Sequence, residues 1–183
     1  MGAGRGMQEL LFVALGTGVA AAVITRGQVS VGATGRAGEL GHLPVFPEGE
    51  WCACGQRGCT ETYASGAALT RRYSVASGVS DVPARDVISR AAAGDPAADG
   101  IFNDAITALG RALVNYVLLM DPEVILIGGG MAAAGAALLE PLAREVQAGL
   151  AWRPAPTISN GRFAGDAGRR GAGLLAWRAL RTP

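Results

Sequence analysis

The sequence contains no lysine, one histidine, three cysteines and few aromatic residues, and each scarcity excludes a class of protein. All 16 basic residues are arginine, and the sequence also has 15 acidic residues, so the formal net charge is +1. This balance gives no electrostatic reason to expect nucleic acid or an anionic membrane as a partner. Three cysteines in 183 residues are too few for a disulfide scaffold. A hydrophobic content of 50% excludes a disordered chain.

Hydrophobic runs that could cross a membrane are also lacking. The longest apolar stretch, roughly 10–24, is interrupted by Gly16-Thr17-Gly18, and the N-terminus has no signal-peptide pattern. We therefore predict a cytoplasmic protein that does not contact membranes. The length allows one domain with a hydrophobic core, but not a complete two-lobed nucleotide-binding enzyme.

The hydrophobic pattern predicts an α/β fold with a mixed sheet. Short apolar runs that end at turns indicate strands at 10–15, 19–24, 28–31, 123–127 and 157–159. Helical spacing indicates helices at 62–73, 84–93, 101–117, 132–150 and 170–180. Strands come first, an irregular insert follows, and helices then alternate with strands, which is typical of an α/β sandwich.

The histidine and the cysteines gather in one segment that is poor in apolar side chains. His42, Cys52, Cys54 and Cys59 fall within 18 positions. Three thiolates and an imidazole make a complete tetrahedral zinc set, and bound zinc would order a segment that has no core of its own. Because four protein ligands leave no open position, we expect this zinc to be structural. A redox trio or unrelated buried thiols are the alternatives.

Two carboxylates flank this cluster. Glu39 precedes His42 by three residues, and Glu61 follows Cys59 by two. Zinc would fix both ends of the insert and bring the carboxylates near the imidazole, where they are suited to bind the neighbouring hydroxyls of a polyol. The alternative is that both are solvated surface charges.

Two glycine turns follow predicted buried strands. Gly16-Thr17-Gly18 could offer backbone N–H groups and a hydroxyl to a phosphate, although no Walker A or Rossmann pattern accompanies it. Gly128-Gly129-Gly130 allows a planar ligand to approach the backbone closely. Each signal is weak alone, because a simple tight turn has the same composition.

Taken together, these motifs resemble the ROK family of repressors, open reading frames and kinases. The resemblance rests on Glu39-Leu-Gly-His42 followed by Cys52-Ala-Cys-Gly-Gln-Arg-Gly-Cys59-Thr-Glu61, with further matches at 121–130 and 165–172. It spans about residues 2–180. It implies an actin-like, ribonuclease-H-like fold of two lobes, with sugar and ATP bound in the cleft between them.

The resemblance also implies the roles of individual residues. Hexose hydroxyls would be bound by Glu39, His42 and Glu61. A structural zinc would be held by His42, Cys52, Cys54 and Cys59. The phosphates of ATP, which carries Mg²⁺, would meet Gly16, Thr17 and Gly18. The adenosine would lie beside Gly128 and Gly129. Because family members commonly dimerise, a homodimer is a further expectation.

Part of the family pattern is not found in this sequence. The resemblance implies a D-x-G-G-T phosphate loop and an Asn-Asp pair whose aspartate is the general base, and the sequence begins just past where that pair would stand. We therefore expect residues 1–183 to form a single C-terminal lobe, with the zinc insert at about 42–61 and without the N-terminal lobe. Asn103-Asp104 lies inside a predicted helix and is interpreted as a surface pair.

The sequence thus favours an ATP-dependent hexose kinase of the glucokinase type, here without its catalytic base. The sugar-sensing lobe of a ROK repressor and a non-catalytic sugar-binding remnant are the alternatives. The phosphate turn favours the kinase, because a repressor has no need of ATP.

Overall fold

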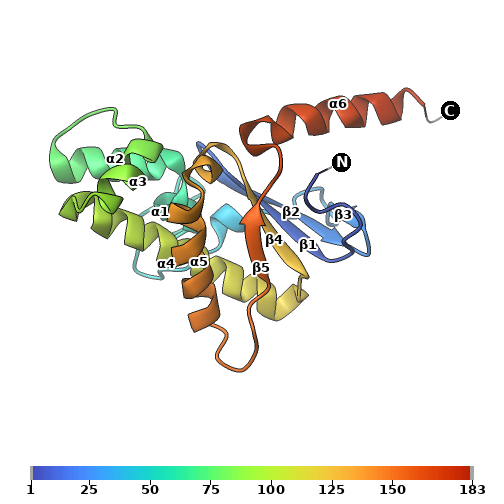
Figure 1. The fold of residues 1–183 in the computed structure, drawn as a ribbon, viewed down its shortest axis with the longest axis horizontal. Coiled ribbons are helices and arrows are strands. Elements are labelled where there is room, and N and C mark those ends of the chain that lie inside the picture. Colours follow the sequence, from blue (N-terminus) through green and yellow to red (C-terminus); the bar gives the residue numbers. More distant parts are fainter. Residues whose placement is uncertain (1, 182–183) are drawn as a thin grey trace.

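A mixed sheet forms the centre of the molecule in the computed structural model, which describes residues 2–181 (Figure 1). Within these residues the sheet has five strands in the order β3-β2-β1-β4-β5. The strands are β1 (Leu10–Leu15), β2 (Val19–Thr25), β3 (Gln28–Ser30), β4 (Val124–Gly128) and β5 (Thr157–Asn160). The first three pair antiparallel, whereas β4 is parallel to both β1 and β5. The predicted mixed α/β architecture is confirmed.

Helices α1 to α5 gather on one side of this sheet, whereas α6 extends away from them (Figure 1). The helices are α1 (Thr60–Ala64), α2 (Gly66–Ser77), α3 (Ala84–Ala92), α4 (Pro96–Met120), α5 (Ala136–Ala148) and α6 (Ala167–Ala179). Short 3-10 turns are η1 (Leu40–His42), η2 (Gly130–Ala134) and η3 (Ala164–Asp166). Among residues 2–181, no helix combines the length and the apolar character needed to cross a membrane.

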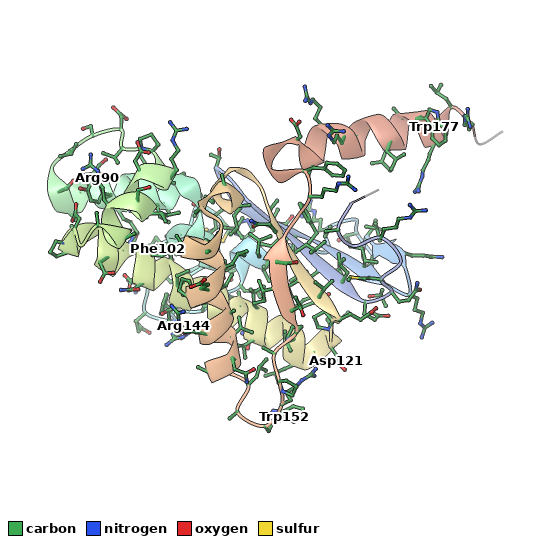
Figure 2. All side chains as sticks on the ribbon, viewed as in Figure 1. Arg90, Phe102, Asp121, Arg144, Trp152 and Trp177 are labelled. Carbon is green, nitrogen blue, oxygen red and sulfur yellow. The ribbon has the colours of Figure 1, made fainter. Side chains whose placement is uncertain are left out.

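The main hydrophobic core lies between the helical layer and one face of the sheet. Leu11, Val13 and Leu15 alternate along β1 toward this face and are fully buried. The opposite face carries a smaller apolar cluster of Leu10, Val124 and Leu126. Figure 2 shows Trp177 on α6 at the periphery, and its side chain is 51% exposed. The sheet is therefore packed by helices mainly on one face within the described residues.

The predicted helix at 62–73 was wrong in its continuity, because the chain breaks at Ser65. This residue has extended backbone (φ −80°, ψ 156°) and its hydroxyl accepts a hydrogen bond of 3.0 Å from Ala68 N. Ser65 therefore ends α1 and caps α2. The break places the start of α2 against the first glycine turn, where Gly66 N donates to Gly16 O at 2.7 Å.

Two other predicted helices have different limits in the structure. The helix predicted from residue 101 begins at Pro96, because Asp95 accepts hydrogen bonds from Ala97 N and Ala98 N at its N-terminus. The helix predicted at 132–150 is divided into η2 and α5 at Gly135, whose φ is +57°. Side-chain capping by Asp95 and the positive φ of Gly135 set these helix limits. The spacing of apolar residues does not predict either feature.

Candidate functional site

The four predicted metal ligands meet in space. The ligand atoms of His42, Cys52, Cys54 and Cys59 all lie within 4.8 Å of one another. Cys52 Sγ is 3.7 Å from His42 Nδ1, and Cys54 Sγ is 3.6 Å from Cys59 Sγ. Zinc–sulfur bonds of about 2.3 Å in a tetrahedron place ligand atoms about 3.8 Å apart. The separations of these ligand atoms are therefore close to those of a four-coordinate zinc site.

The ionisation of the thiols depends on their different surroundings. Burial opposes ionisation of Cys52, but a backbone hydrogen bond from Cys54 and the nearby thiol and imidazole groups lower its pKa to about 7. Burial and the two neighbouring thiols raise the pKa of Cys59 to about 12. A thiol that is buried beside other sulfurs is costly to ionise, and a bound cation would remove that cost.

The insert that carries the cysteines is folded by backbone contacts as well. Pro44 pairs with Cys59 and Trp51 with Arg57 in isolated antiparallel bridges. Gly58 permits the return of the chain, because its φ is +69° and a Cβ there would lie 1.6 Å from the carbonyl oxygen of Phe46. These contacts form a tight double turn that brings Cys59 close to the other three predicted ligands.

The imidazole of His42 lies between the sulfur of Cys52 and the carboxylate of Glu39. Its Nδ1 faces Cys52, whereas its Nε2 lies 3.9 Å from Glu39 Oε2. The side chains of His42 and Glu39 are 36% and 61% exposed, so solvent reaches this pair. Glu61, at the start of α1, follows the cluster in the chain and is half-buried.

The free edge of β2 positions both glutamates. Because the N–H groups of a strand alternate in direction, those of Val19 and Ala21 point away from β1, beyond the end of β3. Ala21 N donates instead to Gly38 O at 2.8 Å, and Val19 N donates to Glu61 Oε2 at 2.7 Å. Glu39 directly follows Gly38, so one strand edge places both carboxylates.

This close approach to β2 requires glycine at two positions. Gly38 has a φ of +96°, and a Cβ there would lie 2.0 Å from Ala21 O. A Cβ on Gly41 would lie 2.3 Å from Val19 O. The glycines of the segment before the cysteines therefore serve to bring Glu39 and His42 against the sheet.

The two glycine turns lie at the carboxyl ends of neighbouring parallel strands. Gly16-Thr17-Gly18 follows β1, and Gly128-Gly129-Gly130 follows β4, its parallel neighbour. An open cavity of about 810 Å³ lies beside them, and Gly16, Thr17, Gly130 and Met131 contribute to its lining. Ligands commonly bind at this end of parallel strands.

The structure separates the predicted glycines by their positions. Gly18 faces the carboxylate of Glu61, and a Cβ there would lie 2.5 Å from Oε2. Gly128 packs against the Phe12 ring and Gly129 against Leu15 O, so Gly130 rather than either of them reaches the cavity. The assignment of Gly128 and Gly129 to an adenosine stays a prediction.

Several polar residues of the cavity were missed by sequence reasoning. They lie on α2, on α3 and on the loop between them: Thr70, Arg71, Ser74, Asp81 and Arg85. No motif joins them, because only the packing of α2 and α3 beside the first glycine turn brings them together. Arg85 is largely exposed and would supply positive charge at the rim.

Asn103 and Asp104 lie on the surface of α4, as predicted. Asn103 Nδ2 donates to Asp99 Oδ2 at 3.1 Å, and Asp104 Oδ2 accepts from Arg72 Nη2 at 2.6 Å. Both side chains are thus engaged in local contacts of the helical layer.

The fold and these motifs match known proteins. The ROK family model matches residues 1–179. The chain is 36% identical to a glucokinase of Thermotoga maritima over 79% of this chain and 50% of that protein. It matches the structure of a ROK hexokinase from Thermus thermophilus with a TM-score of 0.88 and 34% identity, over 100% of this chain and 62% of that one.

A second solved structure shows a bound sugar and nucleotide. It is a ROK family glucokinase from Streptomyces griseus in complex with glucose and AMPPNP, matched with a TM-score of 0.81 and 30% identity over 94% of this chain and 62% of that one. The chain therefore spans about half to three fifths of the length of these relatives. The family model covers nearly all of the sequence, and the chain belongs to the ROK family.

Proposed function

We propose that this chain supplies the hexose site and part of the nucleotide site of an ATP-dependent sugar kinase of the glucokinase type. One observation carries the proposal. Glu39 and Glu61 are placed by the same edge of β2, which leads directly into the glycine turn beside the open cavity. Groups suited to a sugar thus contact one edge of β2, and groups suited to a phosphate lie in the turn that precedes the same strand.

The hexose would be held by three side chains. The carboxylates of Glu39 and Glu61 can accept hydrogen bonds from hydroxyl groups, and His42 Nε2 can take part beside Glu39. Such fixed partners would orient one hydroxyl for phosphoryl transfer, because holding the reacting groups in place lowers the entropic cost of reaction. The relatives named glucokinase support a hexose such as glucose as the substrate.

A zinc ion would act as a structural element of this site. His42, Cys52, Cys54 and Cys59 would hold it, and it supplies no open coordination position for a substrate. It would fix the imidazole of His42, whose Nε2 lies 3.9 Å from Glu39 Oε2. The insert would then present a rigid wall to the sugar.

The nucleotide would occupy the cavity beside Gly16 and Thr17. Gly16 N donates to Gly18 O within the turn, so the groups that can meet the phosphates of Mg²⁺-ATP are the backbone N–H and the exposed hydroxyl of Thr17. Arg85 adds positive charge at the rim. In this proposal residues 1–183 act as a single C-terminal lobe. A cytoplasmic location agrees with the use of ATP, and a homodimer stays a prediction.

Phosphoryl transfer also needs a group that accepts the hydroxyl proton. Asp104, the aspartate of the Asn-Asp pair at 103–104, is held by Arg72 on the helical surface. We therefore propose that this chain binds both substrates but does not turn them over at the rate of a complete kinase.

Two assays test this proposal. Calorimetry should show that a non-hydrolysable ATP analogue binds the 183-residue chain, and that Thr17→Val weakens this binding. A coupled ATP–glucose assay should show no robust turnover. Robust turnover would contradict the proposed division of roles. Sugar binding without any nucleotide binding would instead support a sugar-sensing lobe or a sugar-binding remnant.

A further inference from the structure

Glu61 belongs to the proposed hexose site and also contacts the end of the phosphate turn, because it lies in α1 and accepts a hydrogen bond from Val19 N of β2. We propose that Glu61 couples the two sites, so that hexose binding strengthens nucleotide binding and the reverse. Glu61 then has a positioning role toward the nucleotide in addition to contact with the sugar. This inference rests on the proposed function, since it assumes that both ligands bind this chain.

The first link is the hydrogen bond from the backbone N–H of Val19 to Glu61 Oε2, at 2.7 Å. Val19 directly follows Gly18, and its side chain is only 4% exposed. A Cβ on Gly18 would lie 2.5 Å from the same oxygen. The carboxylate is therefore packed directly against the end of the turn, with no room for another group between them.

The second link runs through the start of α2. Gly66 N donates to Gly16 O at 2.7 Å, and Ala67 N donates to Thr17 O at 3.4 Å. Helix α1 is only five residues long, and Ser65 N donates back to Glu61 O at 3.2 Å. Glu61 and the two amides that hold the carbonyls of the turn thus belong to one short connected segment.

The two oxygens of Glu61 can serve the two sites separately. Oε2 accepts the hydrogen bond from Val19 N, whereas Oε1 has no hydrogen-bond partner among residues 2–181. A carboxylate accepts several hydrogen bonds, so Oε1 can receive a sugar hydroxyl while Oε2 keeps the turn in place. A hexose that fixes the side chain of Glu61 would therefore also order Gly18 and its neighbours.

Coupling follows from this shared ordering. If the hexose fixes Glu61 and the turn, a nucleotide that binds afterwards loses less conformational entropy. Linkage requires the effect to be reciprocal, so the nucleotide must raise hexose affinity by the same factor. If Glu61 held the turn equally well with and without sugar, glucose would not change the affinity for the nucleotide.

The test measures the affinity of the 183-residue chain for a non-hydrolysable ATP analogue, with and without saturating glucose. We expect glucose to tighten nucleotide binding by about fivefold or more. Val19→Pro removes the N–H donor, which points away from the paired residue Leu15 of β1, and also fixes φ at this position. It should bring this factor close to one. Val19→Ala loses similar packing but keeps the donor, and should retain the factor.

Variants of Gly18 and Glu61, together with NMR of the parent chain, test the coupling if Val19→Pro fails to fold. Gly18→Ala should displace the carboxylate and reduce the same factor, whereas Glu61→Gln keeps an acceptor oxygen and should retain more of it than Glu61→Ala. In the parent chain, glucose alone should shift the amide NMR signals of Val19 and Gly18. Retention of the full factor in Val19→Pro or Gly18→Ala would overturn the inference.

The failures of the two proposals are distinguishable. A parent chain that binds both ligands with no mutual effect overturns the coupling and leaves the proposed function standing. A parent chain that binds neither ligand overturns both.

Discussion

Arg72 Nη2 donates to Asp104 Oδ2 at 2.6 Å and thereby joins α2 to α4. The same guanidinium reaches Glu50 of the cysteine-bearing insert through Nε at 3.0 Å, and only 16% of its side chain is exposed. It also lies over the ring of Tyr63. Arg72 therefore fastens the insert to the helical layer independently of any metal.

Replacement of Arg72 by methionine should lower the stability of the chain. The substitution keeps much of the packing but removes hydrogen bonds to two carboxylates, so we expect a loss of about 1–3 kcal/mol in the free energy of unfolding, measured in urea. Arg71 is a matched control, because it pairs with the same Glu50 but is 52% exposed. Arg71→Met should cost less than about 1 kcal/mol. Equal losses would show that burial of Arg72 is unimportant.

Metal analysis of the purified chain should find about one zinc per chain. Cys54→Ser should reduce this content, because it replaces a thiolate that lies 3.6 Å from Cys59 Sγ by a poor zinc ligand. Chelation should likewise lower the melting temperature of the parent chain. Glu48→Gln on the same insert is the control, since its side chain is 94% exposed. A well-folded chain without zinc would refute the site.

Gly38→Ala should disturb both the fold and the sugar site. The new Cβ would lie 2.0 Å from Ala21 O at a φ of +96°, so the segment that carries Glu39 must move away from β2. We expect a loss of more than about 2 kcal/mol. Gly35→Ala also has a positive φ of +74°, but no atom lies within 4 Å, so it should cost only about 1 kcal/mol. Similar costs in a denaturant titration would contradict the proposed contact.

The cap of α4 should make stability depend on pH. Hydrogen bonds from the Tyr73 hydroxyl and from the amides of Ala98 and Ala97 lower the pKa of Asp95. A lowered pKa in the folded state contributes stability that is complete above the ordinary pKa of about 3.9 and is lost as the pH falls through the lower folded value.

Asp95→Asn should therefore lower the urea midpoint at about pH 7, and its difference from the parent should shrink below about pH 4. Asp99→Asn, in the same first turn, is the control and should show a smaller dependence, because Asp99 does not cap the helix. A difference for Asp95→Asn that grows on acidification would contradict this role.

Much of the fold could be predicted from local sequence. The strands of the sheet ended within one or two residues of their predicted limits, because β1, β2 and β4 are short apolar runs and glycine or a turn bounds the shorter β3 and β5. The break at Ser65 and the start of α4 at Pro96 depended on caps, which apolar spacing does not show. The metal cluster was predictable because its four ligands are close in the chain.

The rest of the candidate site depends on tertiary packing. The sequence spacing of Glu61 and Val19 does not predict their hydrogen bond. The bond forms because β3 pairs only with the end of β2 and leaves the N–H of Val19 available to Glu61. Arg71 and Arg85 reach the cavity only because α2 and α3 pack beside the first glycine turn. Sequence motifs marked the groups that could act, and the strand edge determined which of them face one another.

The central claim is that Glu39, His42 and Glu61 form one hexose site, and calorimetric titration with glucose tests it most directly. The parent chain should bind glucose at a single saturable site, and Glu39→Ala should weaken binding by about tenfold or more, through loss of a hydrogen bond to a charged group. Glu48→Ala, an exposed glutamate of the same insert, should bind as the parent does. No binding by the folded parent, or equal binding by Glu39→Ala, would contradict the claim.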